Sequence, residues 1–330
     1  MTERITFTEE LIPGHLTILS FSAREMYIEK MGELFEKHED YCFISAETTS
    51  HSGKMLEVCG KAPERFLEVG IAEANQVSIA AGLALSGKTV FMQGFGPFFA
   101  LRTLDQIHTD IAYHNLPVRI INTHSGLTSG GGPTHYNIMD LAILRIMPNM
   151  IVEVPADANQ CLKAIEATEG IAGPINIRIP RGAEPLVYTT QDYEYVIGKA
   201  ITAVEGTDIT IIACGTAMAL AVSAANGLAK EGISARVLDM HTISPLDKDA
   251  IRKAAAETGN IITVEDHFVD GGLGGAVAEV IADEKLNVNF KRLGIPTDAF
   301  PSLGDMNELY AYYGYDSEGI KKTAREMLGK

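Results

Sequence analysis

The stretch Val69-Gly70-Ile71-Ala72-Glu73-Ala74-Asn75-Gln76 leads into residues that are apolar on nearly every side of a helix. A helix of this kind is normally buried, so we predict a buried helix over Glu73–Leu85. Glu73 is the only acid at its start, where a lone Glu usually does no more than interact favourably with the helix dipole. A buried carboxyl group is costly unless it is partnered or protonated, and such groups are associated with active sites. Glu73 is therefore a candidate catalytic residue.

Short apolar runs alternate with helix-period segments on both sides of this stretch, which predicts parallel sheets covered on both faces. The predicted strands are Tyr41–Ser45, Thr89–Gln93, Pro117–Thr123, Met150–Pro155, Pro174–Ile179, Asp208–Cys214, Ser234–Met240 and Asn260–Asp266. The predicted helices include Glu73–Leu85, Phe98–His114, Ile138–Ile146, Asn159–Glu169, Ala217–Lys230, Lys248–Glu257 and Gly275–Asp283. The polar segment Thr189–Ile197 is typical of a linker. We expect an α/β fold with two parallel or mostly parallel sheet domains, residues 1–190 and 191–330.

Composition excludes some classes of protein. The 330 residues are 46% hydrophobic and 21% charged, which is an ordinary globular balance. The net charge of −16 argues against non-specific binding to nucleic acid or to anionic membranes. No signal peptide or membrane span is evident. Of the four scattered cysteines, Cys42, Cys161 and Cys214 lie in apolar surroundings and are typical of buried thiols in a reducing cytoplasm. We expect a cytoplasmic protein.

Phe95 and Phe98 lie in the stretch Gly94-Phe95-Gly96-Pro97-Phe98-Phe99, between a predicted strand and a predicted helix. Aromatic residues three apart at a helix start more often belong to a core than to a cofactor site. The carboxyl ends of parallel strands, however, are where ligands of open α/β sheets bind. Arg102 and Gln106 follow one turn apart, a spacing that also fits a solvated helix face.

The loop from His124 to His135 follows a predicted strand and contains four glycines. Glycine lets the backbone approach a ligand closely, and histidines can exchange protons or bind hydroxyl groups at neutral pH. The spacing of the two histidines does not fit a metal site. Three arginines, Arg24, Arg178 and Arg181, could bind phosphate, although surface positions explain them equally well. The glycine-rich turn after Val264 does not have dinucleotide-binding spacing, which favours a structural turn.

Together these residues resemble the C-terminal half of transketolase, that is, its pyrimidine-binding domain followed by its C-terminal domain. The resemblance covers the chain from about residue 15 onward. Its most specific pieces are Gly70-Ile71-Ala72-Glu73, Gly94-Phe95-Gly96-Pro97-Phe98, Arg102-x3-Gln106-Ile107, Gly132-Pro133-Thr134-His135 and Pro148-Asn149-Met150.

The resemblance implies that the cofactor is thiamine diphosphate, with Glu73 at N1′ of its aminopyrimidine ring and Phe95 and Phe98 against the ring. It assigns His135 to catalysis on the sugar. The other implied contacts are to substrate or cofactor: Arg24, His124 and Arg181 would bind the sugar phosphate, and Glu47 the cofactor.

The resemblance also implies a missing partner. No Gly-Asp-Gly followed by an Asn, with which the family binds Mg2+ and diphosphate, occurs in the chain, and the nearest match is Gly304-Asp305-Met306. We therefore expect a split transketolase in an α2β2 assembly, whose other subunit holds Mg2+. Its substrates would be sugar phosphates.

Two departures from the family affect the expected substrate. Gly131 replaces an acid that touches a substrate hydroxyl in the family, and Ser45-Ala46-Glu47 replaces Ser-Ala-Asp. The family's serine contact to phosphate maps near Ser50-His51-Ser52. An unusual ketose phosphate or a sulfonate fits these changes. The alternatives are the β subunit of a 2-oxo-acid dehydrogenase and a non-catalytic partner subunit.

Overall fold

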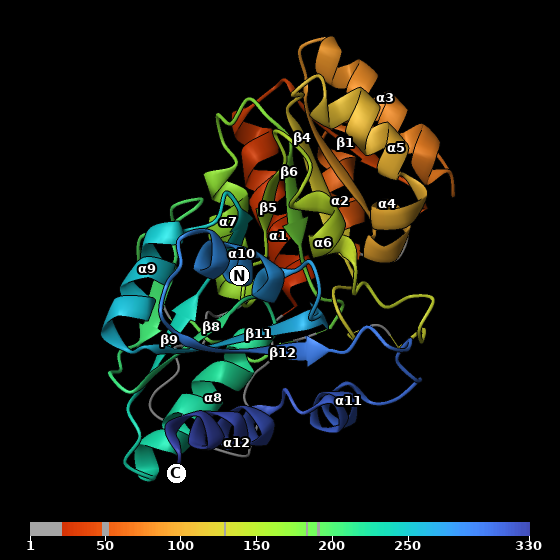
Figure 1. Ribbon diagram of the computed structural model, residues 1–330. Helices are drawn as coiled ribbons and strands as arrows, with labels where there is room; N and C mark the ends of the chain where they lie inside the picture. The colour runs from red at the N-terminus through yellow and green to blue at the C-terminus, as the bar shows by residue number, and fades with distance from the viewer. Residues whose placement is uncertain (1–21, 48–52, 129, 183, 190–191) are drawn as a thin grey trace.

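Two sheets organise the protein in this computed structural model, which describes residues 22–47, 53–128, 130–182, 184–189 and 192–330 (Figure 1). The first sheet has seven strands, in spatial order β10 (Thr242–Ser244), β5 (Ile151–Glu153), β6 (Ile175–Arg178), β4 (Val118–Thr123), β3 (Thr89–Phe95), β1 (Tyr41–Ser45) and β2 (Phe66–Glu68). The second has five, in the order β12 (Asn289–Ile295), β11 (Asn260–Phe268), β8 (Ile209–Ala213), β9 (Ala235–Asp239) and β7 (Ile201–Val204).

Only β10 with β5 and β7 with β9 pair in antiparallel fashion among these strands. The predicted fold class, α/β with two mostly parallel sheets, is therefore confirmed.

Helices cover both faces of the first sheet. One face packs against α1 (Ala23–Lys37), α7 (Ala158–Ala167) and Met55 of α2 (Gly53–Lys61). The other packs against α3 (Glu73–Leu85), α4 (Gly96–Arg102), the π-helix η3 (Ile107–Ala112) and α6 (Asp140–Leu144). Side chains of β1 alternate between these faces, because successive residues of a strand point to opposite sides. Strand β1 is thus apolar and buried from Tyr41 to Ile44, as expected for a strand covered on both faces.

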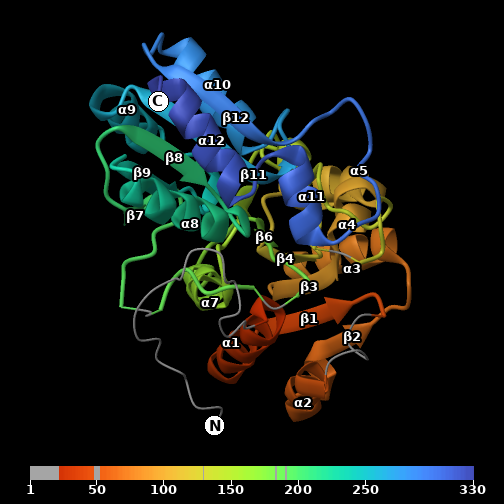
Figure 2. The same ribbon diagram turned by 90° about the horizontal axis from the view of Figure 1, so that it is seen from below.

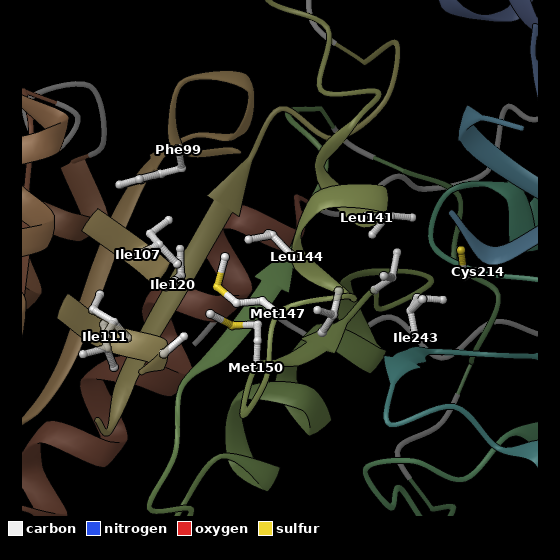
Figure 3. Close-up of a cluster of buried hydrophobic side chains, with 14 of the residues drawn as sticks. Phe99, Ile107, Ile111, Ile120, Leu141, Leu144, Met147, Met150, Cys214 and Ile243 are labelled. Atoms are coloured by element: carbon white, nitrogen blue, oxygen red, sulfur yellow. The ribbon is translucent and has the colours of Figure 1, made fainter. Parts of the chain in front are cut away.

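The second sheet is also covered on both sides, as Figures 1 and 2 show. Its outer face packs against α8 (Ala217–Lys230), α11 (Met306–Tyr313) and α12 (Ser317–Leu328). Its other face packs against α9 (Lys248–Glu257) and α10 (Leu273–Asp283). A single buried cluster continues from Phe99 and Ile107 in the first half of the chain to Cys214 and Ile243 in the second (Figure 3). The two halves therefore pack together through a shared buried cluster.

Two helix predictions were too long. The predicted helix Phe98–His114 is divided into α4, α5 (Leu104–Gln106) and η3, with a break at Thr103, where φ is −110° and ψ is 14°. The Thr103 hydroxyl donates to the carbonyl of Phe99 at 2.9 Å, a local bond that competes with regular helix geometry. The predicted helix Ile138–Ile146 is reduced to the five residues of α6.

The segment predicted as a linker packs against the body of the protein, apart from Thr190 and Gln191, which lie outside the described residues. Tyr195 donates a hydrogen bond to buried Glu153 at 2.7 Å and stacks on His241. The four cysteines are free thiols, and Cys42, Cys161 and Cys214 are buried, as predicted. Within the described part of the chain, every helix is too short or too polar to cross a membrane.

Candidate active site

The predicted site residues gather where neighbouring parallel strands end. Phe95 ends β3, His124 directly follows β4, Glu47 lies two residues after β1, and Arg181 lies three residues after β6. These four strands are adjacent in the order β6-β4-β3-β1, so their carboxyl ends form one continuous edge. Glu73 begins α3 beside this edge. The edge is the expected ligand-binding side of an open α/β sheet.

Glu73 is buried, with 6% of its surface exposed, and its carboxylate is paired with Arg102. Nη1 of Arg102 donates to both carboxylate oxygens, at 2.9 and 2.8 Å. The same guanidinium lies over the ring of Phe98, 4.6 Å from its centroid. Phe98 and Arg102 are four residues apart on α4, a spacing that places their side chains on one face. Arg102 therefore orients the Glu73 carboxylate next to an aromatic ring.

Phe95 and Phe98 form a tilted pair with ring centroids 5.8 Å apart. Phe95 contacts the His124 ring at a centroid distance of 4.1 Å, and Phe98 contacts His135 at 5.4 Å. Both phenylalanines are partly exposed. The two phenylalanines thus contact both histidines, and Phe98 also contacts Arg102, the partner of Glu73.

His124 is a neutral imidazole at pH 7. Burial, together with the nearby positive charges of Arg181 and Arg24, lowers its pKa to about 4. Nδ1 lies 2.8 Å from Oγ1 of Thr123, and that hydroxyl donates its one proton to the carbonyl of Gly94 at 2.9 Å. The hydroxyl must then accept from Nδ1, which assigns the proton to Nδ1 and the free lone pair to Nε2. His124 can accept a hydrogen bond or a proton through Nε2.

His135 lies against the backbone of Gly131. A Cβ atom placed on Gly131 would lie 2.7 Å from Cγ of His135 and 2.9 Å from its Cβ, closer than real side chains approach. Thr134 contacts Nδ1 of His135 at 3.0 Å through its hydroxyl. The position of His135 therefore depends on the absence of a side chain at residue 131.

The remaining predicted ligands differ in exposure. Arg181 is exposed and Arg24 partly buried, and their charges act on His124. Glu47 is exposed with a left-handed φ of 60°, and its N–H donates to Glu68 at 2.5 Å. The predicted phosphate contact at Ser50–Ser52 lies outside the described residues.

Arg178 does not belong to the open site. Its guanidinium is 2% exposed and pairs with Asp140, with Nε at 2.8 Å from Oδ2. The glycine-rich turn before α10 is also structural. Buried Glu265 accepts the first N–H groups of that helix, from Leu273 at 2.7 Å and Gly274 at 2.8 Å. An internal carboxylate thus takes the position where a phosphate could bind at the helix start.

The described residues contain no group of three or more His, Cys, Asp or Glu side chains that could hold a metal ion. Asp305, in the Gly-Asp-Met match, caps helix α11 by accepting from the N–H groups of Asn307 and Glu308. That match is therefore a helix cap in this structure.

The protein is thus an α/β protein in which a buried acid lies beside paired aromatic rings, near the carboxyl ends of the parallel strands. Residues 20–185 match the pyrimidine binding domain of transketolase, and residues 198–320 match the transketolase C-terminal domain. The chain belongs to the transketolase family and is a transferase of that type. The predicted resemblance is confirmed.

Similar proteins include two transketolase subunits and a split gene transketolase of known structure. One of the subunits of the apulose-4-phosphate transketolase of Phocaeicola vulgatus is 41% identical over 312 residues, covering 94% of this chain and 98% of that protein. The 6-deoxy-6-sulfo-D-fructose transketolase subunit of a Clostridium species is 34% identical over 305 residues, which cover 92% of this chain and 94% of that protein. A structure described as a split gene transketolase, inactive beta4 tetramer, has a TM-score of 0.84 at 34% identity, covering 94% of this chain and 99% of that one.

The pyrimidine binding domain implies thiamine diphosphate as the cofactor. The residues present fit its aminopyrimidine end, because that ring is flat and carries a nitrogen that a carboxyl group can bind. Glu73 supplies the buried carboxyl group, and Phe95 and Phe98 supply aromatic faces beside it.

The sequence interpretation missed Arg102 as the partner of Glu73. The four-residue spacing from Phe98 is the signal that could have found it. It also missed the role of Thr123 in setting the His124 tautomer. That role depends on the carbonyl of Gly94 in a neighbouring strand, which no local pattern reveals.

Proposed function

We propose that the chain is the C-terminal-type subunit of a split transketolase, which transfers a two-carbon ketol unit from a ketose phosphate to an aldose or aldose phosphate. The observation that carries the proposal is the joint placement of Glu73, the Phe95–Phe98 pair and two histidines at one sheet edge. A second subunit would hold the diphosphate and Mg2+, in a heterotetramer with two copies of each chain. The similar tetramer of β chains, described as inactive, supports the need for such a partner.

Thiamine diphosphate, when bound, supplies the electron sink that allows a bond between two sugar carbons to break and re-form. Glu73 would bind N1′ of the aminopyrimidine ring and share a proton with it, and Arg102 fixes the direction of the Glu73 carboxyl group. Phe95 and Phe98 would pack against this ring and exclude water from it. These residues bind and orient the cofactor.

The two histidines and two arginines act on the sugar. His124 accepts a hydrogen bond or a proton from a substrate hydroxyl at Nε2, since its Nδ1 already donates to Thr123. His135 binds or deprotonates a second hydroxyl. Arg24 and Arg181 attract the anionic end of the sugar, and their charge already acts on His124. A guanidinium binds phosphate or sulfonate oxygens in pairs, so both kinds of anionic ketose fit this group.

The test is reconstitution with a subunit that carries Gly-Asp-Gly and the following Asn. The pair should be purified together and assayed with thiamine diphosphate and Mg2+ against common ketose phosphates, apulose 4-phosphate and 6-deoxy-6-sulfofructose. We expect two-carbon transfer that requires both subunits. Decarboxylation of a 2-oxo acid instead would assign the chain to the dehydrogenase β subunits. A stable complex with neither activity would favour a non-catalytic subunit.

A further inference from the structure

The histidine loop, which we define as His124–Asn137 without the undescribed Ser129, is closed at its base. The N–H of Gly126 donates to the carbonyl of Asn137 at 2.9 Å, and the N–H of Asn137 donates back to Gly126 at 3.1 Å. His124 lies just before this base, and His135 lies just inside its other end. A small movement of the base therefore changes the position of both imidazoles.

A carboxylate from the second sheet holds this base. Asp266 lies in β11, is 2% exposed, and accepts the N–H of Leu127 on both oxygens, at 3.2 and 3.1 Å. Tyr310 donates to its Oδ2 at 2.8 Å and Tyr315 to its Oδ1 at 3.1 Å. Because each oxygen accepts more than one donor, an amide at this position cannot replace the carboxylate.

The backbone at Gly126 is shaped to receive Asp266. A Cβ atom on Gly126 would lie 1.8 Å from Oδ2 of Asp266, and φ at Gly126 is +58°, a conformation that L side chains rarely adopt. Glycine is thus required here for two independent reasons. The close approach fixes the loop base relative to β11.

Arg178 of β6 also links the loop base to β11. Its Nη2 donates to the carbonyl of Asn137 at 2.6 Å and to the carbonyl of Asp266 at 2.9 Å, while Nε pairs with Asp140. Asn137 in turn donates to Asp140 at 2.9 Å. These bonds lie in the buried interior, where hydrogen bonds are electrostatically stronger than in water, although Oδ1 of Asn137 and Oδ1 of Asp140 have no hydrogen-bond partner in the described structure.

We propose that Asp266 is a positioning residue, through which the second domain sets the placement of His124 and His135 for sugar recognition. The contact network stands by itself, but the effect on sugar binding rests on the proposed function. Asp266 is far in sequence from both histidines and acts only through the loop base. Glu73, Arg102 and Phe98 make no contact with Asp266 in the described structure, so cofactor binding should not depend on it.

The experiment compares Asp266→Asn with Asp239→Asn in the complex reconstituted with the second subunit, thiamine diphosphate and Mg2+. Asp239 is a matched control. It is a fully buried aspartate of the second sheet that also contacts the first half of the chain, through Gln160 at 2.6 Å and Tyr188 at 2.6 Å, but not the histidine loop. Tyr315→Phe is a milder variant that removes one donor to Asp266 and tests the same network if Asp266→Asn folds poorly.

Two measurements decide the outcome. In hydrogen–deuterium exchange, peptides covering residues 124–137 should exchange faster in Asp266→Asn and Tyr315→Phe, but not in Asp239→Asn. In kinetics, KM for the donor ketose should rise about tenfold or more in Asp266→Asn, the expected size for a displaced binding group. The Kd of thiamine diphosphate, measured by calorimetry, should stay within about twofold. A tenfold increase, which corresponds to about 1.4 kcal/mol, would mean that the cofactor site is disturbed as well.

Unchanged exchange of residues 124–137 in both test variants would overturn the proposal. An equal loss of cofactor and sugar binding would overturn it too, because that result indicates general damage. If the wild-type complex shows no transfer with any donor, the proposed function fails, while the exchange comparison still decides whether Asp266 holds the loop.

Discussion

At the residue scale, the Glu73 carboxyl group is buried, oriented by Arg102 and placed beside aromatic rings. Glu73→Gln keeps the shape of the side chain but removes its ability to exchange a proton. We expect turnover to fall by about two or more orders of magnitude, comparable to the loss of an acid–base group. The measurement is ketol-transfer kcat in the reconstituted complex.

The control for this variant is Glu64→Gln, because the Glu64 side chain is 73% exposed and lies outside the site. It should leave kcat unchanged. Near-normal turnover of Glu73→Gln, with the complex intact by size-exclusion chromatography, would refute the role assigned to Glu73.

Gly131 provides a second prediction at this scale. Because a Cβ at this position would come within 2.7 Å of the His135 ring, Gly131→Ala should displace the imidazole. We expect kcat/KM for the donor ketose to fall about tenfold to a hundredfold, the size of effect that a small misplacement produces. Stability should change little, since Gly131 is exposed.

The matched variant for Gly131→Ala is Gly130→Ala. A Cβ on Gly130 has one neighbour within 4 Å, the flexible Nη1 of Arg181 at 3.4 Å, so this change should have a much smaller effect. Equal kinetics for the two variants would show that the Gly131–His135 contact does not matter for the sugar.

At the element scale, eight strands of the two sheets and several of the covering helices could be predicted, because burial on both faces leaves a local signal. Strand β1 and helices α3, α8 and α9 have the predicted bounds, and the other predicted strands differ by a few residues at their ends. Strands β2, β7, β10 and β12 were not predicted; the three-residue β10, for example, pairs with β5, about 90 positions earlier in the chain. Short elements defined by distant partners carry no periodicity of their own.

Helix α6 illustrates the same limit. Asp140 begins it with a buried carboxylate that binds Arg178 of β6. The backbone before α6 belongs to the loop base, and turns follow the helix from Arg145. The sequence interpretation predicted His124 and His135 as site residues, but not Asp266, Thr123 or Arg102, which hold or orient site residues through contacts made in the folded chain.

At the scale of the whole molecule, two buried carboxyl groups bond across the halves: Glu153 accepts from Tyr195, and Asp239 accepts from Gln160. The division into 1–190 and 191–330 stays a prediction, and β10 shows that a strand from the second half completes the first sheet. Glu153, Asp239 and Glu265 are fully buried. Burial raises the pKa of Glu153 to about 8 and those of Asp239 and Glu265 to about 7.

These raised pKa values determine how stability depends on pH. The folded protein keeps a proton on Glu153 up to about pH 8, whereas the unfolded chain loses it near pH 4.5. The folded state therefore binds more protons in this window, so the free energy of unfolding falls as pH rises. The buried histidines His124, His241 and His267, whose pKa values burial lowers to about 4, act in the opposite direction, but only below about pH 6.5.

Urea unfolding should thus show decreasing stability from pH 6.5 to 8, and Glu153→Gln should reduce that slope. Gln cannot ionise but can still accept the hydrogen bond from Tyr195. In the described structure, Oε1 of Glu153 accepts from Tyr195 and Oε2 has no hydrogen-bond partner, which is an unfavourable environment for a negative charge. One such site contributes at most about 1.4 kcal/mol per pH unit, so the two slopes should differ by up to that amount. Parallel slopes for the two proteins, measured at equal concentration, would mean that Glu153 is ionised in the folded state and that Tyr195 holds a carboxylate rather than a carboxylic acid.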